Sequence, residues 1–168
     1  MTSLVRSRAG WRSAVPDQSS ARASDAYLAA LAAGLVGWNY LGGGFVWDDG
    51  PLIAGRLAKA DWSQVLSLWT APVADAGPGA SYYRPLALTV LSGLGRLGPL
   101  AIHLVATCLH ALSAMLMVRC CSSLRSPLLG ALIFAVHPLV SEVLGWSSAL
   151  PDALAVTLGL LAVQVGGD

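Results

Sequence analysis

Residues 97–118 read LGPLAIHLVATCLHALSAMLMV, and this stretch decides the fold class because its 22 positions contain no acid, lysine or arginine. At a rise of about 1.5 Å per residue, a helix of this length spans roughly 30 Å, the thickness of the hydrocarbon core of a bilayer. Residues 26–46 form another uncharged stretch, of 21 positions. Both stretches therefore predict transmembrane helices.

The composition of the whole chain is that of a membrane protein. Of its 168 residues, 55% are hydrophobic and 11% are charged, and the mean hydropathy is +0.65. Two shorter apolar runs flank a brief polar link and predict an antiparallel pair of further crossings. We expect an all-α membrane protein with about four transmembrane helices, at residues 26–46, 97–118, 126–144 and 152–167, and with short amphipathic interfacial helices in the loop 47–96.

The arginines predict the orientation of these helices. Four arginines precede the first helix, and Arg119 and Arg125 lie between the second and the third. The positive-inside rule places both segments in the cytoplasm, so the loop 47–96 and the link between the last two helices face outward. The Ser/Ala/Arg-rich residues 1–24 predict a disordered cytoplasmic tail before a membrane domain at 25–168. No basic cluster is interleaved with aromatic residues, so no nucleic-acid partner is expected.

Two adjacent carboxylates, Asp48 and Asp49, follow the first apolar stretch in the segment FVWDDGPLI (residues 45–53). A pair of acids beside a membrane crossing is either a topological stop or a chemical centre. Further along the same loop, Asp61 and Gln64 have the spacing of a capping box. The apolar positions that follow Asp61 recur at helical spacing, which predicts a short amphipathic helix with two tryptophans at the membrane interface.

The segment SYYRPL (residues 81–86) predicts the start of another helix, because Pro85 fits a first helical turn. Arg84 would then lie at the positive end of the helix dipole, where an anion would be stabilising. Exposed backbone N–H groups together with a guanidinium describe a phosphate site. Alternatively, Arg84 reaches lipid headgroups or pairs with Asp48 or Asp49. The residues leave these interpretations open.

The segment FAVHPLVSEV (residues 134–143) predicts that the third helix kinks or ends at Pro138, near the outer surface. Glu142 and Asp152 bracket the second outer link, and ionisable groups at membrane depth are functional candidates. His137 and Glu142 do not have the spacing of a helical metal pair, so we expect no metal site there. The structural alternative for His137 is a hydrogen bond to a carbonyl.

Two further histidines, His103 and His110, lie seven residues apart on one face of the second helix. Interhelical hydrogen bonding explains such residues economically. A small transporter or proton relay that uses His103, His110, His137 and Glu142 is another interpretation, and it rests on these intramembrane groups alone.

Taken in order, the segments FVWDDGPLI, SYYRPL, HLVATCLHAL and FAVHPLVSEVLGWSSALPDALA resemble the amino-terminal part of polytopic C-type glycosyltransferase-like proteins. The similarity is to the branch that often carries tetratricopeptide repeats and is related to protein O-mannosyltransferases. It covers about residues 25–165. The resemblance implies an integral protein, of a bacterial inner membrane, that transfers a sugar from a polyprenyl-phosphate carrier to an acceptor on the outer face.

The resemblance also implies roles for individual residues. Asp48 would be the base for the acceptor hydroxyl, and Arg84 would bind the donor phosphate. Neighbouring side chains of an extended segment point to opposite faces, so Asp49 would orient the loop, bind acceptor or assist a divalent metal. No resident cofactor or fixed metal site is expected. The remaining residues expected to line the substrate cavity are Tyr83, His137, Glu142 and Asp152.

Members of that family have more membrane crossings, and this sequence shows no tetratricopeptide periodicity. We therefore expect a truncated or split hexosyltransferase of the mannosyltransferase type. It would be inactive by itself, with membrane lipid and the lipid-linked donor as partners and a second chain completing the membrane domain. The alternative is a non-catalytic membrane remnant or structural membrane segment.

Overall fold

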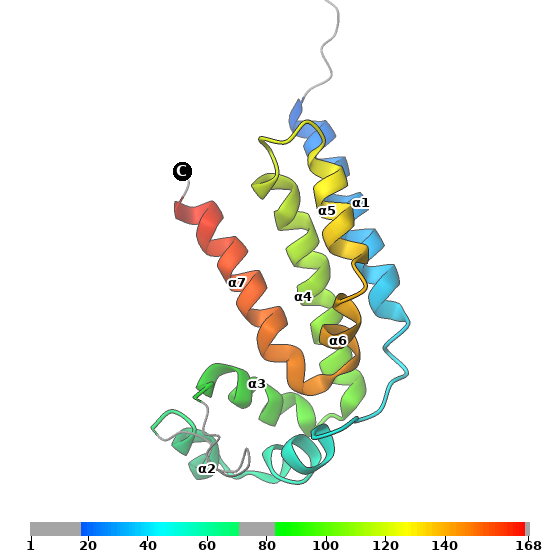
Figure 1. Ribbon diagram of the computed structural model, residues 1–168. Coiled ribbons are helices and arrows are strands. Elements are labelled where there is room, and N and C mark those ends of the chain that lie inside the picture. The colour runs from blue at the N-terminus through cyan, green and yellow to red at the C-terminus, as the bar shows by residue number, and fades with distance from the viewer. Residues whose placement is uncertain (1–17, 71–82, 167–168) are drawn as a thin grey trace, which may run out of the picture.

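The computed structural model describes residues 18–70 and 83–166, with side chains from residue 22 onward, and this described part contains helices and no strands. Four helices stand upright and form a bundle (Figure 1). Beneath them lies a lower layer of short helical segments. The upright helices are α1 (Gln18–Trp38), α4 (Pro99–Cys120), α5 (Pro127–Val136) and α7 (Leu150–Gly166). The shorter segments are η1 (Gly50–Ala54), η2 (Leu57–Lys59), α2 (Trp62–Ser67), α3 (Pro85–Gly95), α6 (Val140–Gly145) and η3 (Ser147–Ala149).

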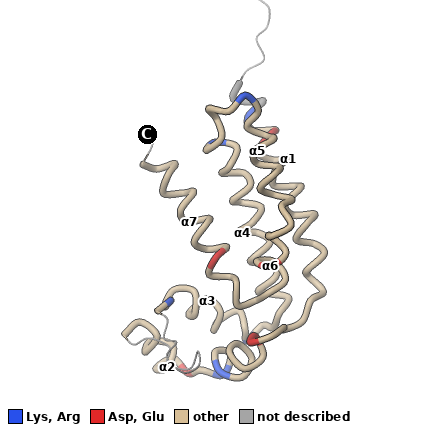
Figure 2. Tube along the Cα trace, in the orientation of Figure 1, with Lys and Arg blue, Asp and Glu red and all other residues tan. Residues whose placement is uncertain are grey.

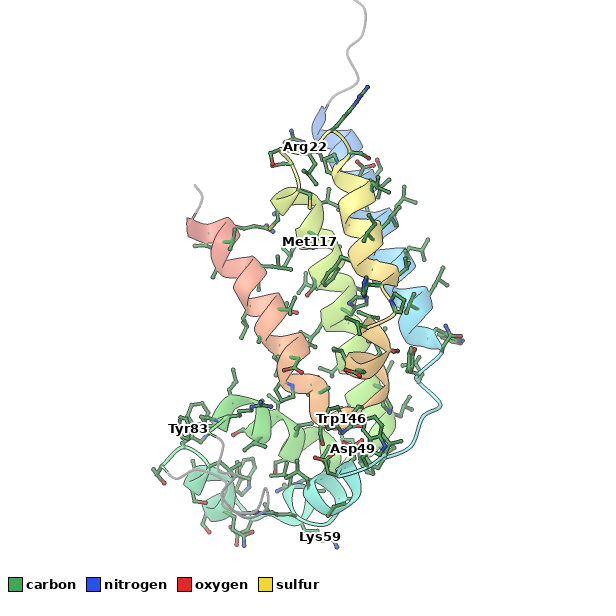
Figure 3. All side chains as sticks on the ribbon, in the orientation of Figure 1. Arg22, Asp49, Lys59, Tyr83, Met117 and Trp146 are labelled. Carbon is green, nitrogen blue, oxygen red and sulfur yellow. The ribbon has the colours of Figure 1, made fainter. Side chains whose placement is uncertain are left out.

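The upright helices alternate in direction, and this places unlike residues at the two ends of the bundle. Basic residues lie at the end where α1 begins and where α4 connects to α5, and others lie in the lower layer (Figure 2). Arg22 lies at that end, whereas Asp49 and Trp146 lie together at the other end (Figure 3). The two segments predicted to face the cytoplasm therefore share one end, and the two predicted outer loops meet at the opposite one.

Within the described residues, two helical segments are long and apolar enough to cross a membrane by length and composition. They are α4 and the continuous segment Ser147–Gly166. Helices α3 and α5 are shorter apolar helices. The all-α class is confirmed, and the number of four crossings stays a prediction.

The first helix differs from its predicted bounds of 26–46. It begins at Gln18, so residues 18–24, which were predicted to be disordered, are helical. It ends at Trp38, where the Asn39 side-chain amide donates to the carbonyls of Leu35 and Val36 at 3.1 and 3.2 Å. Three glycines at 42–44 follow, and glycine is a poor helix former because it loses the most backbone entropy. The uncharged stretch therefore ends in turns and extended backbone.

The third predicted helix, 126–144, is two helices in the structure. Helix α5 ends at Val136, and His137 has extended backbone angles of φ −62° and ψ 134°. Pro138 disfavours helical backbone at the residue before it, which explains the break and confirms the predicted interruption. The fourth helix was predicted from 152 and begins at Leu150. Residues 1–17, 71–82 and 167–168 lie outside the described residues.

Small side chains bring α1, α4 and α5 close together. The buried residues at this contact are mostly alanines, which let helix backbones approach one another. Gly37 marks a very close approach, since a Cβ atom there would overlap the side chain of Thr107 on α4. The buried residues of this cluster are Ala29, Ala33, Ala114, Val118, Ala131 and Ala135.

Hydrogen bonds connect α4 to its other neighbours. The Nδ1–H of His103 donates to the Leu144 carbonyl at 2.8 Å, and the Nε2–H of His110 donates to the Ala135 carbonyl at 2.9 Å. The ring nitrogens must donate here because a carbonyl oxygen can only accept. The predicted interhelical hydrogen bonding of both histidines is confirmed. One nitrogen of each ring thus makes a structural hydrogen bond, and the buried Nε2 of His103 has no partner among the described residues.

The lower layer contains the predicted capping box, at the start of α2. The Asp61 carboxylate accepts from the Gln64 N–H at 2.9 Å, and the Gln64 side chain accepts from the Asp61 N–H at 2.9 Å. Helix α3 begins at Pro85, as predicted, and its buried Ser92 hydroxyl donates to the Leu57 carbonyl at 2.8 Å. A shared apolar core then joins this layer to α4, α6 and α7, through Ile53, Leu57, Leu68, Leu88, Leu91, Ile102, Ala106, Leu144 and Leu150.

Candidate functional site

The site begins at a strained turn in the segment FVWDDG. Trp47 has φ +49°, in the left-handed region that bulky residues rarely adopt. The turn is closed by two hydrogen bonds between the same pair of residues. The Asp49 N–H donates to the Val46 carbonyl at 2.9 Å, and the Val46 N–H donates to the Asp49 carboxylate at 3.1 Å. Such strain persists only where surrounding contacts impose it, and it is concentrated at functional sites.

The carboxylate of Asp49 is fully buried and joins the two outer loops. Besides the Val46 N–H, it accepts hydrogen bonds from the N–H groups of Ser147 at 3.1 Å and Ser148 at 2.8 Å. The Ser148 hydroxyl donates a fourth bond at 2.6 Å. Both oxygens are thus occupied. This geometry is that of a residue that orients the loop, one of the roles expected for Asp49.

Asp48 has the opposite environment, because its side chain is exposed. Its Oδ1 accepts a hydrogen bond from the Trp146 indole N–H at 2.9 Å, and its Oδ2 accepts none from the described residues. The Trp146 ring meets the Trp47 ring edge-on, with centroids 5.4 Å apart and planes at 75°. The carboxylate of Asp48 is therefore held in one orientation while an oxygen faces outward.

Asp48 and Arg84 line the same pocket, of about 170 Å³. Arg84 is the residue before Pro85 at the start of α3, so its backbone adjoins the N-terminus of that helix. The pocket draws on three parts of the chain that are distant in sequence. Its other lining residues are Leu52, Leu88, Leu91, Trp146, Ser148 and Pro151.

The remaining predicted cavity residues lie elsewhere. The exposed Tyr83 donates its hydroxyl to the Trp69 carbonyl at 2.8 Å. His137 lines a separate apolar pocket of about 430 Å³ beside α5 and α6. Asp152 lines a third, apolar pocket of about 90 Å³ together with His110. The described residues therefore do not form a single cavity that contains all these side chains.

Two residues of the second outer segment, His137 and Glu142, do not line the pocket of Asp48. Helix α6 buries Leu144 in the core, and Glu142, two residues earlier, lies on the other side of the helix and is exposed. The ring Nδ1 of His137 accepts a hydrogen bond from the Leu139 N–H at 3.2 Å, so the expected bond to a carbonyl is wrong. Among the described residues, no three or more His, Cys, Asp or Glu side chains are placed to share a metal ion.

The residues that sequence reasoning missed are in the link Trp146–Ser147–Ser148. Trp146 orients Asp48, and the two serines occupy Asp49. A tryptophan followed by two small hydroxyl residues between two apolar helices was the available signal. Its pairing with an acid 98 residues earlier depends on the folded bundle.

Comparison with known proteins finds a similar protein that carries a function in its name. Over 118 residues the chain is 33% identical to mouse (Mus musculus) protein O-mannosyl-transferase TMTC3. The chain is thus similar to a protein O-mannosyl-transferase. The aligned region covers 62% of this chain and 12% of TMTC3, so the chain spans a small part of that relative. No protein-family model matches, and no solved structure matches.

Proposed function

We propose that this chain is part of a membrane glycosyltransferase that transfers a hexose from a polyprenyl-phosphate donor to an acceptor hydroxyl on the extracytoplasmic face. The pocket shared by Asp48 and Arg84 is the observation that carries this proposal. It combines a fixed carboxylate with a guanidinium at a helix start. The similarity to protein O-mannosyl-transferase TMTC3 supports a mannose-type sugar.

In the proposed reaction, Asp48 acts as general base. Its outward oxygen takes the proton of the acceptor hydroxyl while the acceptor oxygen forms a bond to C1 of the sugar. The bond between C1 and the phosphate oxygen breaks, and its electron pair leaves with the polyprenyl phosphate. The hydrogen bond from Trp146 holds the other oxygen of Asp48, which limits the orientations that the base can adopt.

Arg84 has the proposed role of binding the phosphate of the donor. A guanidinium offers a planar fork of N–H donors that matches phosphate oxygens. Arg84 is the residue before the first turn of α3, so the positive dipole end of this 11-residue helix would add to the attraction for a phosphate. These charges stabilise the anion as the bond to C1 breaks.

Asp49 has a supporting role in this proposal. Its four hydrogen bonds hold the segment 46–49 against the link 147–148 and so keep Asp48 and Trp146 in register. The proposed outward orientation of the site rests on the positive-inside rule, which assigns the arginines before α1 and between α4 and α5 to the cytoplasm. A second chain that supplies the helices of a complete donor cavity is part of the proposal.

A donor-binding and transfer assay on the full chain in its native membranes, which would also hold the proposed second chain, tests this function. A photoreactive polyprenyl-phosphate mannose should label the wild-type chain, and Arg84→Gln should reduce labelling about tenfold, the effect of losing a charge-assisted hydrogen bond. Transfer to a serine-containing peptide should fall at least ~100-fold in Asp48→Asn, because an amide still accepts from Trp146 but cannot act as base.

Asp25→Asn and Arg22→Gln are matched controls, because they make the same chemical changes near the start of α1, at the opposite end of the bundle. Neither should alter labelling or transfer. Labelling that is equal in the wild type and in Arg84→Gln would remove the donor role of this pocket. The Asp48→Asn/Arg84→Gln double variant gives the background of the assay. If labelling and transfer by the wild type do not exceed this background, the chain is a non-catalytic membrane segment.

A further inference from the structure

Another pocket, of about 370 Å³, lies in the lower layer between η2 and α2. It shares no lining residue with the pocket of Asp48 and Arg84. Two cationic side chains, an amide and a hydroxyl line it, over an apolar base. The lining residues are Gly55, Arg56, Leu57, Lys59, Ala60, Gln64, Ser67 and Leu68.

Within residues 18–70 and 83–166, the charges around this pocket are mainly positive. Arg56 and Lys59 belong to its wall, and the guanidinium of Arg96 donates to the carbonyl of Ala60, another lining residue. The acid nearest in sequence is Asp61, whose carboxylate accepts from the Gln64 N–H at 2.9 Å and the Ser63 hydroxyl at 2.7 Å. Asp61 is therefore bound within the first turn of α2. The pocket has the electrostatic character of an anion site.

Exposed apolar side chains surround the cations. On α2 and the turn after it, Trp62, Leu66 and Trp69 are 73%, 66% and 48% exposed. The guanidinium of Arg96 lies over the Trp62 ring at 5.6 Å, which keeps a cation beside the aromatic group. Tryptophans gather at the level of lipid headgroups, where basic side chains meet phosphates. This combination favours a lipid over a freely dissolved anion.

We propose that the pocket of Arg56 and Lys59 binds the phosphate of an anionic lipid headgroup. The two cations bind the phosphate oxygens, and the Gln64 amide and Ser67 hydroxyl offer polar contacts to the rest of the headgroup. Bound lipid would hold α2 and η2 at the outer membrane surface. Since η2 packs on α3, the lipid would also steady the helix that begins beside Arg84.

Calorimetric titration of the detergent-solubilised full chain tests this site. The probes are dihexanoyl-phosphatidylglycerol, dihexanoyl-phosphatidylcholine and inorganic phosphate, at low salt. Phosphatidylglycerol should bind more tightly than phosphatidylcholine, and Arg56→Gln/Lys59→Gln should weaken its binding about tenfold or more. Added salt should weaken it too, because the attraction is between charges near water. Inorganic phosphate should compete poorly. If inorganic phosphate binds as tightly as phosphatidylglycerol, the ligand of this pocket is a free phosphate and not a lipid headgroup.

Further variants separate this site from misfolding and from the proposed donor pocket. Arg56→Lys/Lys59→Arg keeps both charges and should retain binding, and Arg22→Gln/Arg125→Gln removes two arginines at the other end without effect. Asp48→Asn and Arg84→Gln should leave phosphatidylglycerol binding unchanged. Wild-type affinity in Arg56→Gln/Lys59→Gln, equal affinity for both lipids, or loss of binding in Arg84→Gln would each overturn the inference.

Discussion

The indole N–H of Trp146 donates a 2.9 Å hydrogen bond to Oδ1 of Asp48, across 98 residues of sequence. This bond joins the loop after α1 to the link before α7. The edge-on contact of the same indole with Trp47 supports it. A side chain that is remote in sequence thereby orients the carboxylate proposed as base.

A double-mutant cycle measures this relationship. Trp146→Phe keeps an aromatic ring against Trp47 and removes the donor, whereas Asp48→Ala removes the acceptor. We expect a coupling of about 1 kcal/mol in the free energy of unfolding, the usual size of one net hydrogen bond. Denaturation in mixed detergent provides the measurement. A coupling near zero would mean that the bond does not contribute to the orientation of Asp48.

Asp49 and Asp48 should respond differently to the same substitution. Asp49→Ala leaves three buried or half-buried N–H donors without their partner, so we expect a loss of about 3 kcal/mol or more in unfolding free energy. Asp48→Ala loses one bond at an exposed carboxylate and should cost about 1 kcal/mol. Equal losses in the same mixed-detergent denaturation would contradict the structural role of Asp49.

The contact of α1 with α4 should be sensitive to one methyl group at Gly37. Gly37→Ala places a Cβ against Thr107 and should cost about 1–3 kcal/mol, the range for overpacking. Gly34→Ala is the matched control, because nothing lies within 4 Å of its added Cβ. We expect it to be neutral or slightly stabilising. Addition of Thr107→Ala to Gly37→Ala should recover part of the stability, and no recovery would place the clash elsewhere.

The start of α2 should depend on pH through Asp61. Hydrogen bonds from the Gln64 backbone and the Ser63 side chain hold the pKa of the exposed Asp61 carboxyl below its ordinary 3.8. A lowered folded-state pKa means that the cap stabilises fully above the ordinary value and is lost as pH falls through the lowered one. Protection of the Gln64 amide from hydrogen exchange should therefore decrease below about pH 4.

Asp61→Asn is the control for this titration, since asparagine caps a helix without ionising. Its Gln64 amide protection should change little over the same range. A decrease that is equal in both proteins would assign the pH dependence to another group.

Local signals in the sequence predicted much of the helical structure. The capping box at Asp61, the helix start at Pro85 and the interruption at Pro138 depend on neighbouring residues, and the structure confirms each of them. The apolar stretch 97–118 is another such case, because its predicted bounds differ from those of α4 (Pro99–Cys120) by two residues at each end. Hydropathy placed the end of the first helix at 46, whereas α1 ends at Trp38, because the uncharged residues that follow include three glycines, which do not continue a helix.

The sequence by itself also predicted that Asp48 and Arg84 lie at the same end of the bundle, because both belong to the loop 47–96 and no upright helix separates them. Only the tertiary structure decided that Asp49 is buried and occupied while Asp48 faces a pocket, and that His137 and Glu142 lie apart from it. The physical reason is that adjacent residues share their local signals and differ in what packs against them. Those partners, Trp146, Ser147 and Ser148, arrive from almost 100 residues away when the bundle folds.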